Sequence, residues 1–426
     1  MLPLNEQTFE RAAAEAPPWA RPLAETGFDA FGSLPMPTPQ EEDWRYVEMV
    51  ADLDAVGLAE GPGAPLAGEG LAASVVIAAG TAVNVDGFTV SVNSEGPGVL
   101  TSLLEAFSSH GDALRRAYRT AGPAADLDRF SAAHHAFGRD GVVLLLPRGS
   151  VSERPYLVEF QAITPGTLAL PRLTVLAEDG SEGSVVVHFR SPDGTPVMAV
   201  PQIEVLTGAD ARFGLTLIQE WGDQTYAVTQ QRMASGRDAA LHLSEIGFGG
   251  SSARLHLIVD LEGRGSDARV LGLYFGDRRQ TLDYRFFMNH RAPNTTSEMY
   301  LKGAVGDTAR SVFTGMIRID PEGQKSDAVQ TNRNLILSEG AEAHSVPNLE
   351  ILANEVKCGH GSAVGPLDAE QRHYLMSRGL DRARADRLQV KGFFEDVLAR
   401  FSRQELGPPL REAVMAKYAA VVSRES

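Results

Sequence analysis

The feature that most restricts the fold of this 426-residue chain is a stretch from about Gly141 to Gly361 in which short apolar or alternating segments recur without helical periodicity. Turn residues such as Gly249-Gly250 and Pro321-Glu322-Gly323 separate many of them. Alternation with a period of two, bounded by glycine and proline, is typical of β-strands. The region is therefore predicted to be all-β, with strands near 142–146, 156–160, 185–189, 240–243, 255–261, 270–275, 284–287, 312–319, 335–337 and 349–352.

Two all-β layouts fit this pattern. A sandwich or barrel uses hairpin turns and usually closes with fewer strands. A solenoid of stacked β-rungs accommodates about two hundred residues of short strands, because each rung buries its face on the next. No strict sequence repeat is visible, so the pattern alone only slightly favours the solenoid.

The flanking regions are predicted to be helical. Residues 1–140 are expected to form a mostly helical domain, with helices at 6–16 and 102–120 and short β-like pieces at 74–77 and 88–92. Residues 141–365 would form the β core, and 366–426 a small helical domain. Its first helix, 369–378, would end at Gly379, and a second would carry Leu388, Phe394, Val397, Leu398 and Phe401 on one face.

Composition excludes some partners. The formal charge of −16 and a pI near 5.1 disfavour binding to nucleic acid or to an anionic membrane, because the mean field repels polyanions. The first residues contain neither a basic region nor an apolar core of a secretory signal, and no run of about 18 apolar residues occurs. A single cysteine fits a reducing compartment. We therefore expect a cytoplasmic protein.

Several common catalytic motifs are absent. The dipeptide Gly-Lys does not occur, so no Walker A loop can cradle nucleotide phosphates, and the chain is not expected to hydrolyse ATP by itself. A β-solenoid hydrolase of acidic polysaccharides is an alternative, for which Asp260, Asp283 and Arg285 are the only loose candidates. Isolated histidines, including His188 and His256, are more typical of packed or solvated side chains than of ligands.

Cys358 and His360 form the most specific candidate site. They lie two residues apart, just after the β-patterned stretch ends, so in an extended segment they project to one face, roughly 7 Å apart. Three interpretations are open: a small buried cysteine, a nucleophile with His360 as base, or a pair of metal or sulfur ligands. As metal ligands, two side chains are too few for a complete site.

Several motifs together resemble the SufB/SufD family, and its SufD branch in particular. They are Glu42-Asp43-Trp44-Arg45-Tyr46, the stretch 332–343, Pro347-Asn348-Leu349-Glu350-Ile351, Val356-Lys357-Cys358-Gly359-His360-Gly361, the stretch 374–380 and Gly392-Phe393. The last hundred residues or so carry the specific motifs, whereas the middle of the chain is similar mainly in its pattern of short apolar segments and turns.

The resemblance implies a right-handed parallel β-helix core flanked by α-helical N- and C-terminal domains. It implies a non-catalytic scaffold subunit of the SUF iron–sulfur cluster assembly system. A SufB-type subunit would pair with it through the β-helix ends, and a SufC-type ABC ATPase would bind the C-terminal helices. In isolation the chain could pair with a second copy. Docking candidates are Tyr374, Arg378, Gly379, Leu388, Phe393 and Phe394.

Within the SufD branch, Cys358 and His360 correspond to the cysteine and histidine at the SufB interface, which implies transient metal ligands to a nascent cluster and no permanently bound cofactor. Gly359 replaces the usual serine, so we expect less regular strand geometry there. A SufB-like paralogue is disfavoured by Asn332-Arg333-Asn334, where its functional cysteine is expected. A purely architectural subunit that only holds ATPases is a further alternative.

Overall fold

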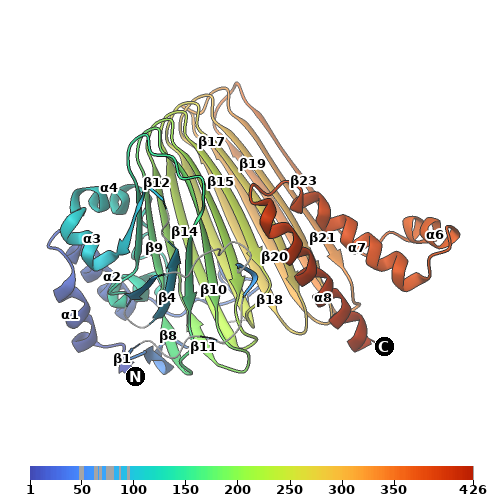
Figure 1. Cartoon of the computed structure of the whole chain (residues 1–426), viewed down its shortest axis with the longest axis horizontal. Helices are drawn as coiled ribbons and strands as arrows, with labels where there is room; N and C mark the ends of the chain where they lie inside the picture. The colour runs from blue at the N-terminus through green and yellow to red at the C-terminus, as the bar shows by residue number, and fades with distance from the viewer. Residues whose placement is uncertain are drawn as a thin grey trace.

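Two long sheets run side by side through most of the computed structural model of this chain (Figure 1). The structure describes residues 1–47, 52–61, 66, 70–72, 81–85, 88–93 and 96–425, with only the backbone for 81–85 and 88–93. The predicted β piece at 74–77 lies outside the described residues. The piece at 88–92 falls within β4 (Phe88–Asn93), which pairs antiparallel with β3 (Thr81–Val85) and β7.

One sheet, in its described part, contains eight parallel strands in chain order, each paired with the strand of the next rung. They are β7 (Tyr156–Gln161), β10 (Glu182–Arg190), β13 (Arg212–Glu220), β15 (Ala240–Gly247), β17 (Asp267–Gly276), β19 (Thr296–Val305), β21 (Asp327–Ile336) and β23 (Lys357–Gly365). We call this the helix-covered sheet, because the C-terminal helices pack on it.

The second sheet supplies the other wall of each rung. Its parallel strands are β6 (Val142–Leu146), β8 (Thr167–Ala169), β9 (Arg172–Ala177), β11 (Val197–Ala199), β12 (Gln202–Thr207), β14 (Thr225–Ser235), β16 (Ser252–Leu261), β18 (Thr281–His290), β20 (Arg310–Ile319) and β22 (Glu342–Ile351). The short strands β1 (Leu2–Pro3), β2 (Gly57–Leu58) and β5 (Val99–Ser102) extend its beginning. The chain is a parallel β-solenoid of about eight turns, so the predicted β-helix is confirmed and the sandwich or barrel is wrong.

The corners between rungs explain why turn residues recur in the sequence. Asp210, Asp238 and Asn294 have φ of 58°, 53° and 60° at three of the connections from the second sheet to the helix-covered sheet, and Gly265, with φ of 75°, occupies the connection between the last two. Aspartate and asparagine tolerate this left-handed conformation better than most residues, because their short side chains can hydrogen-bond locally. The chain can therefore reverse direction at each corner without a hairpin.

Side-chain alternation divides the helix-covered sheet into two faces. Residues such as Leu243 and Tyr274 point into the solenoid and join its main core, whereas Ile246 and Phe275 point outward and pack against the C-terminal helices. Because a parallel sheet covered on both faces buries both sets of side chains, its strands lose the simple apolar–polar alternation of an exposed sheet.

The N-terminal helices cover the start of the solenoid. They are α1 (Glu6–Glu15), α2 (Arg21–Ser33), α3 (Leu103–Ser109), α4 (Gly111–Ala121) and α5 (Arg129–Phe137), with 3-10 turns at Glu42–Trp44 and Leu53–Ala55. The single helix predicted at 102–120 is wrong, because His110 leaves the helical conformation between α3 and α4. Phe9, Phe31 and Phe130 belong to the same core cluster as the strands, so these helices share the core of the solenoid.

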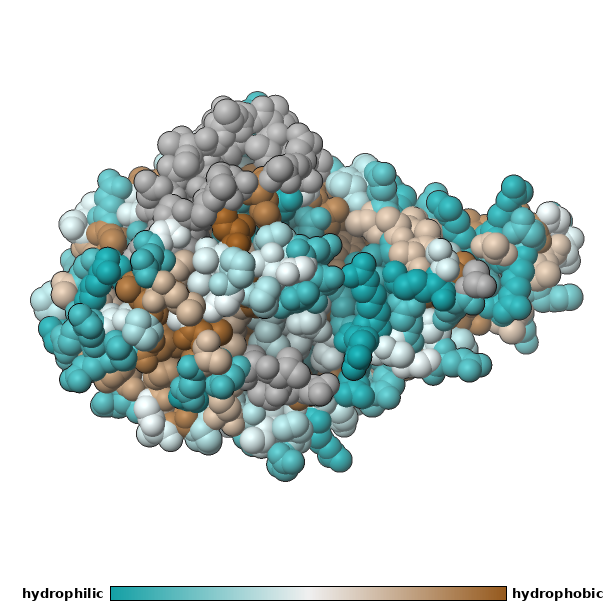
Figure 2. Space-filling view, turned by 90° about the horizontal axis from the view of Figure 1, so that it is seen from below, coloured by the Kyte–Doolittle hydropathy of each residue, from teal (hydrophilic) through white to brown (hydrophobic). Residues whose placement is uncertain are grey.

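Three helices follow the last strand. They are α6 (Ala369–Ser377), α7 (Arg382–Leu398) and α8 (Gly407–Glu425), with a 3-10 turn at Gln404–Leu406. Helices α7 and α8 lie on the helix-covered sheet, and α6 projects beyond the solenoid as an arm (Figures 1 and 2). In the described part of the chain, every helix is too short or too polar to cross a membrane.

Candidate functional site

The site that holds Cys358 and His360 lies at the open end of the solenoid. Strand β23 pairs with β21 on one side, and among the described residues no strand pairs with its other edge. Strand β22 is likewise the last strand of the second sheet and pairs with β20. Unpaired N–H and C=O groups at a sheet edge are ready to pair with another chain. We call the exposed surface of β22 and β23 the end face.

Cys358 and His360 both project from the inner face of β23. Cys358 is in register with Ala328, and His360 with Gln330. Ala328 and Gln330 are 2% and 1% exposed inside the solenoid, which shows that this side of the sheet faces the interior. Cys358 itself is half-buried and packs against the main core, whereas His360 is exposed. The prediction that the two side chains share a face is confirmed.

Gly359 does not disturb this arrangement. It lies in register with Val329 in a continuous parallel pairing, and a Cβ built at Gly359 would meet no atom within 4 Å. The expectation of irregular strand geometry at Gly359 is therefore wrong. The segment is also part of the last strand, whereas the sequence pattern places it after the β region.

The thiol of Cys358 is held in its neutral form in the isolated chain. Partial burial raises the pKa of Cys358, and the nearby carboxylate of Asp327 raises it further, while a hydrogen bond from the backbone N–H of Gly359 lowers it. A thiolate is the form that binds metals. The thiol would therefore ionise on meeting a cation or another positive group.

Exposed apolar side chains form a rim along the last rungs, at the end face. Large hydrophobic residues on the last rungs are 37–48% exposed, namely Val329, Leu349, Ile351, Leu352 and Val364. Open strand edges and clustered apolar side chains are features of surfaces that associate with protein. The end face thus combines a thiol, an imidazole, unpaired strand edges and an apolar rim.

The motif around Trp44 has a structural role that the sequence did not reveal. Trp44 is buried on the outer face of the second sheet, with the guanidinium of Arg254 3.8 Å from its ring centroid. Two residues later, Tyr46 stacks on His344 of β22, with ring centroids 4.8 Å apart. The N-terminal segment therefore runs along the sheet to the end face.

The candidate residues for a polysaccharide hydrolase are engaged in structural pairs. Asp260 is fully buried and accepts hydrogen bonds from Arg232 and Arg291. Asp283 is paired with Arg254 at 2.6 Å, and Arg285 donates to Asp43 of the N-terminal segment. These groups are neutralised or covered, so they do not form an open row of acids and bases on one face.

The predicted docking residues fall into two groups. In the arm, Tyr374 is 57% exposed beneath the guanidinium of Arg378, 5.2 Å from its ring centroid, and Gly379 ends the helix with φ of 92°. Leu388 on α7 is 46% exposed.

Phe393 and Phe394 lie differently. Phe394 is 1% exposed and packs against Phe275 of β17. Phe393 is partly buried beside Lys302, whose ammonium lies 4.5 Å from its ring centroid. Phe394 therefore attaches α7 to the sheet and presents no surface to a partner in this conformation.

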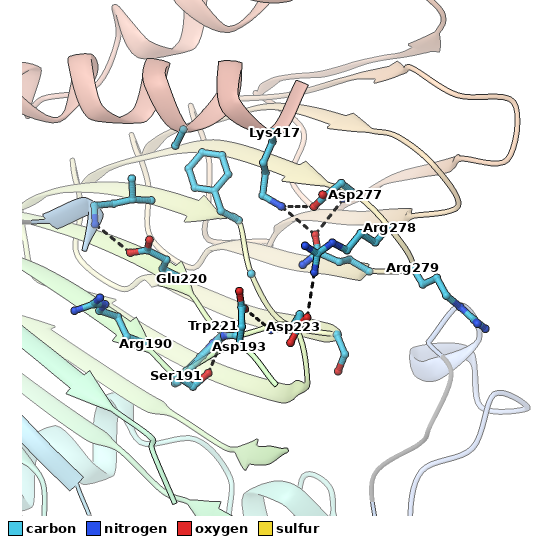
Figure 3. Close-up of a pocket in the computed structure, with 17 residues that line it drawn as sticks. Arg190, Ser191, Asp193, Glu220, Trp221, Asp223, Asp277, Arg278, Arg279 and Lys417 are labelled. Atoms are coloured by element: carbon cyan, nitrogen blue, oxygen red, sulfur yellow. Dashed lines mark hydrogen bonds and ion pairs between the residues drawn. The ribbon is translucent and has the colours of Figure 1, made fainter. Parts of the chain in front are cut away.

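A separate cavity of about 650 Å³ lies between α8 and the corner turns of the rungs (Figure 3). Its charged side chains largely neutralise one another: Lys417 donates to Asp277, and Arg278 pairs with Asp223 at 3.1 Å. This balance gives no preference for an anion or a cation. In the described part of the chain, no group of three or more His, Cys, Asp or Glu residues is arranged to hold a metal ion.

Comparison with known proteins identifies the family. Residues 160–393, more than half of the chain, match the family model described as "SUF system FeS cluster assembly, SufBD core domain". The chain belongs to the SufBD family. An iron–sulfur cluster assembly SufBD family protein of Mycobacterium tuberculosis is 34% identical over 295 residues, which cover 67% of this chain and 73% of that protein.

Two relatives carry the name SufD. The iron–sulfur cluster assembly protein SufD of Bacillus subtilis is 28% identical over 304 residues, covering 70% of this chain and 69% of the relative. SufD of Escherichia coli is 28% identical over 215 residues, covering 50% and 51%. The resemblance to SufD noted in the sequence is thus confirmed, and this SufBD family member is an iron–sulfur cluster assembly protein.

Proposed function

We propose that this chain is a SufD-like scaffold subunit whose end face binds a SufB-type subunit, and that Cys358 and His360 donate two ligands to a nascent iron–sulfur cluster at that junction. The single observation that carries the proposal is that both side chains lie on the inner face of a terminal strand with an open edge. The cluster is the cargo of the assembly, and it leaves after it is built.

The number of donors supports a shared site. Iron–sulfur clusters are usually held by four protein ligands, most often cysteines. The end face offers one thiol and one imidazole, so the remaining ligands would come from the partner or from exogenous thiols. Docking would also cover the rim that includes Ile351 and Val364, and it would extend the sheets through the open edges of β22 and β23.

The experiment is to co-express the chain with the SufB-type and SufC-type proteins of the same cell and to load the purified complex anaerobically with iron and sulfide. Cys358→Ala and His360→Ala should each lower the iron and acid-labile sulfide content several-fold while the subunits still co-purify. Ser362→Ala is the matched control, because Ser362 projects from the same face of β23. Unchanged cluster content in both variants would contradict the ligand role.

Docking through the end face has its own test. Val364→Asp should release the SufB-type subunit without unfolding the chain, since Val364 is 41% exposed and the charge would be buried only in the complex. Light scattering of the chain alone would show whether a second copy occupies the same face. Retention of the SufB-type subunit by the variant would contradict this docking mode.

The arm supplies the second part of the proposal, the binding of a SufC-type ABC ATPase. No residue of α6 is fully buried, and apart from the side that pairs with α7 through Arg372 and Asp386, most of its surface is exposed. The chain has no Walker A loop, so ATP hydrolysis would belong to that partner. Tyr374→Ala and Leu388→Ala should weaken ATPase binding in a pull-down experiment, whereas Val364→Asp should leave it intact. If both Tyr374→Ala and Leu388→Ala bind the ATPase as well as the unmodified chain does, the docking surface lies elsewhere.

A further inference from the structure

The segment 43–47 crosses the outer face of the second sheet toward its last strand. One column of register partners on that face runs from β16 to β22 and consists of Arg254, Asp283, Val312 and His344. The segment contacts both ends of this column, because Trp44 lies against the first member and Tyr46 stacks on the last. Residues from near the start of the chain therefore reach the last rung of the solenoid.

Two buried residues anchor this segment. The side chains of Trp44 and Val47 are 3% and 2% exposed. The guanidinium of Arg254 also holds the backbone, because it donates to the carbonyl oxygen of Asp43 at 2.6 Å. The backbone N–H of Val47 donates to the carbonyl oxygen of Trp44 at 3.0 Å, so a turn lies between the two anchors. The two residues inside this turn are thus held from both sides.

The residues inside the turn are Arg45 and Tyr46. Arg45 is exposed, and its guanidinium lies 5.8 Å from the ring centroid of Tyr46. Tyr46 is half-buried, and its ring centroid lies 4.8 Å from that of His344. Among the described residues, neither the guanidinium of Arg45 nor the hydroxyl of Tyr46 has a hydrogen-bond partner. We call the side chains of Arg45, Tyr46 and His344 the outer corner.

The carboxylates on the outer face of β22 do not neutralise Arg45. Glu342 accepts a hydrogen bond from Arg310 of β20 at 2.9 Å, and Glu350 accepts one from Arg318 of the same strand at 3.2 Å. Within the part of the chain that the structure describes, no carboxylate pairs with Arg45. The guanidinium of Arg45 is therefore available to a carboxylate that comes from another chain.

We propose that the outer corner is part of the surface that binds the SufB-type subunit, and that Arg45 pairs there with a carboxylate of that subunit. The inference rests on the proposed docking through the end face, which it extends around the edge of β22. Continuity supports it, because His344 belongs to β22, whose free edge contributes to the end face. Arginine and tyrosine are also among the residues that most often dominate the binding energy of protein interfaces.

The anchored turn is suited to binding. Ordering a free loop on association costs conformational entropy, and burial of Trp44 and Val47 before the partner arrives removes most of that cost. An exposed charge such as Arg45 acts mainly on the association rate and on its salt dependence, because it steers the encounter. Tyr46 would act mainly on the dissociation rate, because its ring and hydroxyl would be covered only in the complex.

The experiment measures association and dissociation rates of the SufB-type subunit of the same cell on the full chain by biolayer interferometry, at low and high salt. The test variants are Arg45→Glu and Tyr46→Ala. Arg11→Glu, at an exposed position of α1, is the matched control for the charge change, and Tyr374→Ala is the control for loss of an exposed tyrosine. Val364→Asp reports separately on docking through the end face. Hydrogen exchange of residues 342–351 shows whether a variant alters β22 itself.

We expect Arg45→Glu to lower the affinity about tenfold, mainly through slower association that no longer weakens as salt is added. Tyr46→Ala should raise the dissociation rate several-fold, whereas Arg11→Glu and Tyr374→Ala should leave both rates unchanged. Unchanged rates in both test variants would overturn the inference. Release of the subunit by Val364→Asp in the same experiment would then leave the proposed docking intact.

Three further outcomes are equally decisive. If Tyr46→Ala weakens binding only together with faster exchange in β22, and Arg45→Glu has no effect, the outer corner supports the strand and not the partner, and the inference is wrong. If Val364→Asp leaves binding intact while Arg45→Glu weakens it, the outer corner is upheld and docking through the rest of the end face is refuted. If Arg45→Glu only separates a dimer of the chain in light scattering, the occupant is a second copy, and the inference is overturned.

Discussion

Replacing Glu245 by glutamine should stabilise the fold, and the gain should depend on pH. The ordinary pKa of a glutamate is 4.5, and burial in the solenoid raises that of Glu245 to about 8. Folding above pH 4.5 therefore requires the unfolded chain to take up a proton. This requirement costs nothing below pH 4.5, grows by about 1.4 kcal/mol for each pH unit, and levels off above pH 8.

The magnitude follows from the same difference. Because the pKa of Glu245 rises from 4.5 in the unfolded chain to about 8 in the folded protein, the folded protein loses about 5 kcal/mol of stability at pH 9. At pH 7 the loss is about 3 kcal/mol. The amide introduced by Glu245→Gln has no such cost. It can accept from Gln231 as the carboxyl group does, and its own N–H groups can donate to the buried Gln231 oxygen, which now has no partner.

The assay is the free energy of unfolding from urea titrations at pH 5, 7 and 9 for the unmodified chain and for Glu245→Gln. Glu322→Gln, at an exposed turn, is the matched control and should give a difference near zero at every pH. A gain for Glu245→Gln that is the same at all three pH values would refute the reasoning, because a packing effect does not titrate. A loss of stability at pH 9 would refute it as well.

Two further predictions concern packing. Phe394→Ala should lower the free energy of unfolding by about 3–5 kcal/mol, because it removes a buried aromatic side chain. Tyr374→Ala should change the free energy of unfolding by less than about 0.5 kcal/mol, because Tyr374 is exposed. Calorimetry distinguishes the two variants. Gly303→Ala should be strongly destabilising, because the added Cβ would collide with the ring of Tyr274. Gly359→Ala should be tolerated, because the space around Gly359 is open. Equal melting temperatures for the two variants would contradict the packing at Gly303.

The fold could be predicted where strands carry strong apolar patterns. Segments such as 255–261 fall inside observed strands because their inner faces carry leucine and valine. The strand Thr225–Ser235 was not predicted, because Thr229 and Gln231 project into the core and interrupt the apolar alternation. The polar interior that hides this strand from a pattern search is the same feature that accommodates Glu245.

The pairing of Cys358 with His360 could be predicted because it depends only on the two-residue period of an extended chain. The sequence could not predict that β23 is a strand, because Gly359, Gly361 and Gly365 lower its β propensity. Its pairing with β21 imposes the extended conformation, which is a tertiary contact that local preference does not reveal.

The docking residues show a similar limit. Phe393 and Phe394 are adjacent in sequence, and both are hydrophobic, so composition cannot tell which one faces the sheet. The structure places Phe394 against Phe275. Helix periodicity predicts that an apolar face exists, but which face it packs against depends on the position of the helix on the solenoid.

Large polar side chains beneath the end face lie opposite glycines of other rungs. Tyr274 spans the rung between its own strand and Asn332 only because Gly303 leaves room for its ring, and Gln330 fills the space left by Gly315 in the same way. Tyr274 and Gln330, two large polar side chains beneath the end face, thus each lie opposite a glycine. If polarity inside the solenoid were incidental, these glycines could be replaced together with their polar partners by ordinary apolar residues without loss. We therefore expect Tyr274→Phe to lower the free energy of unfolding, because it leaves the buried side chains of Asn332 and Asn334 without their shared hydrogen-bond partner; an unchanged free energy of unfolding in urea titrations would contradict this role.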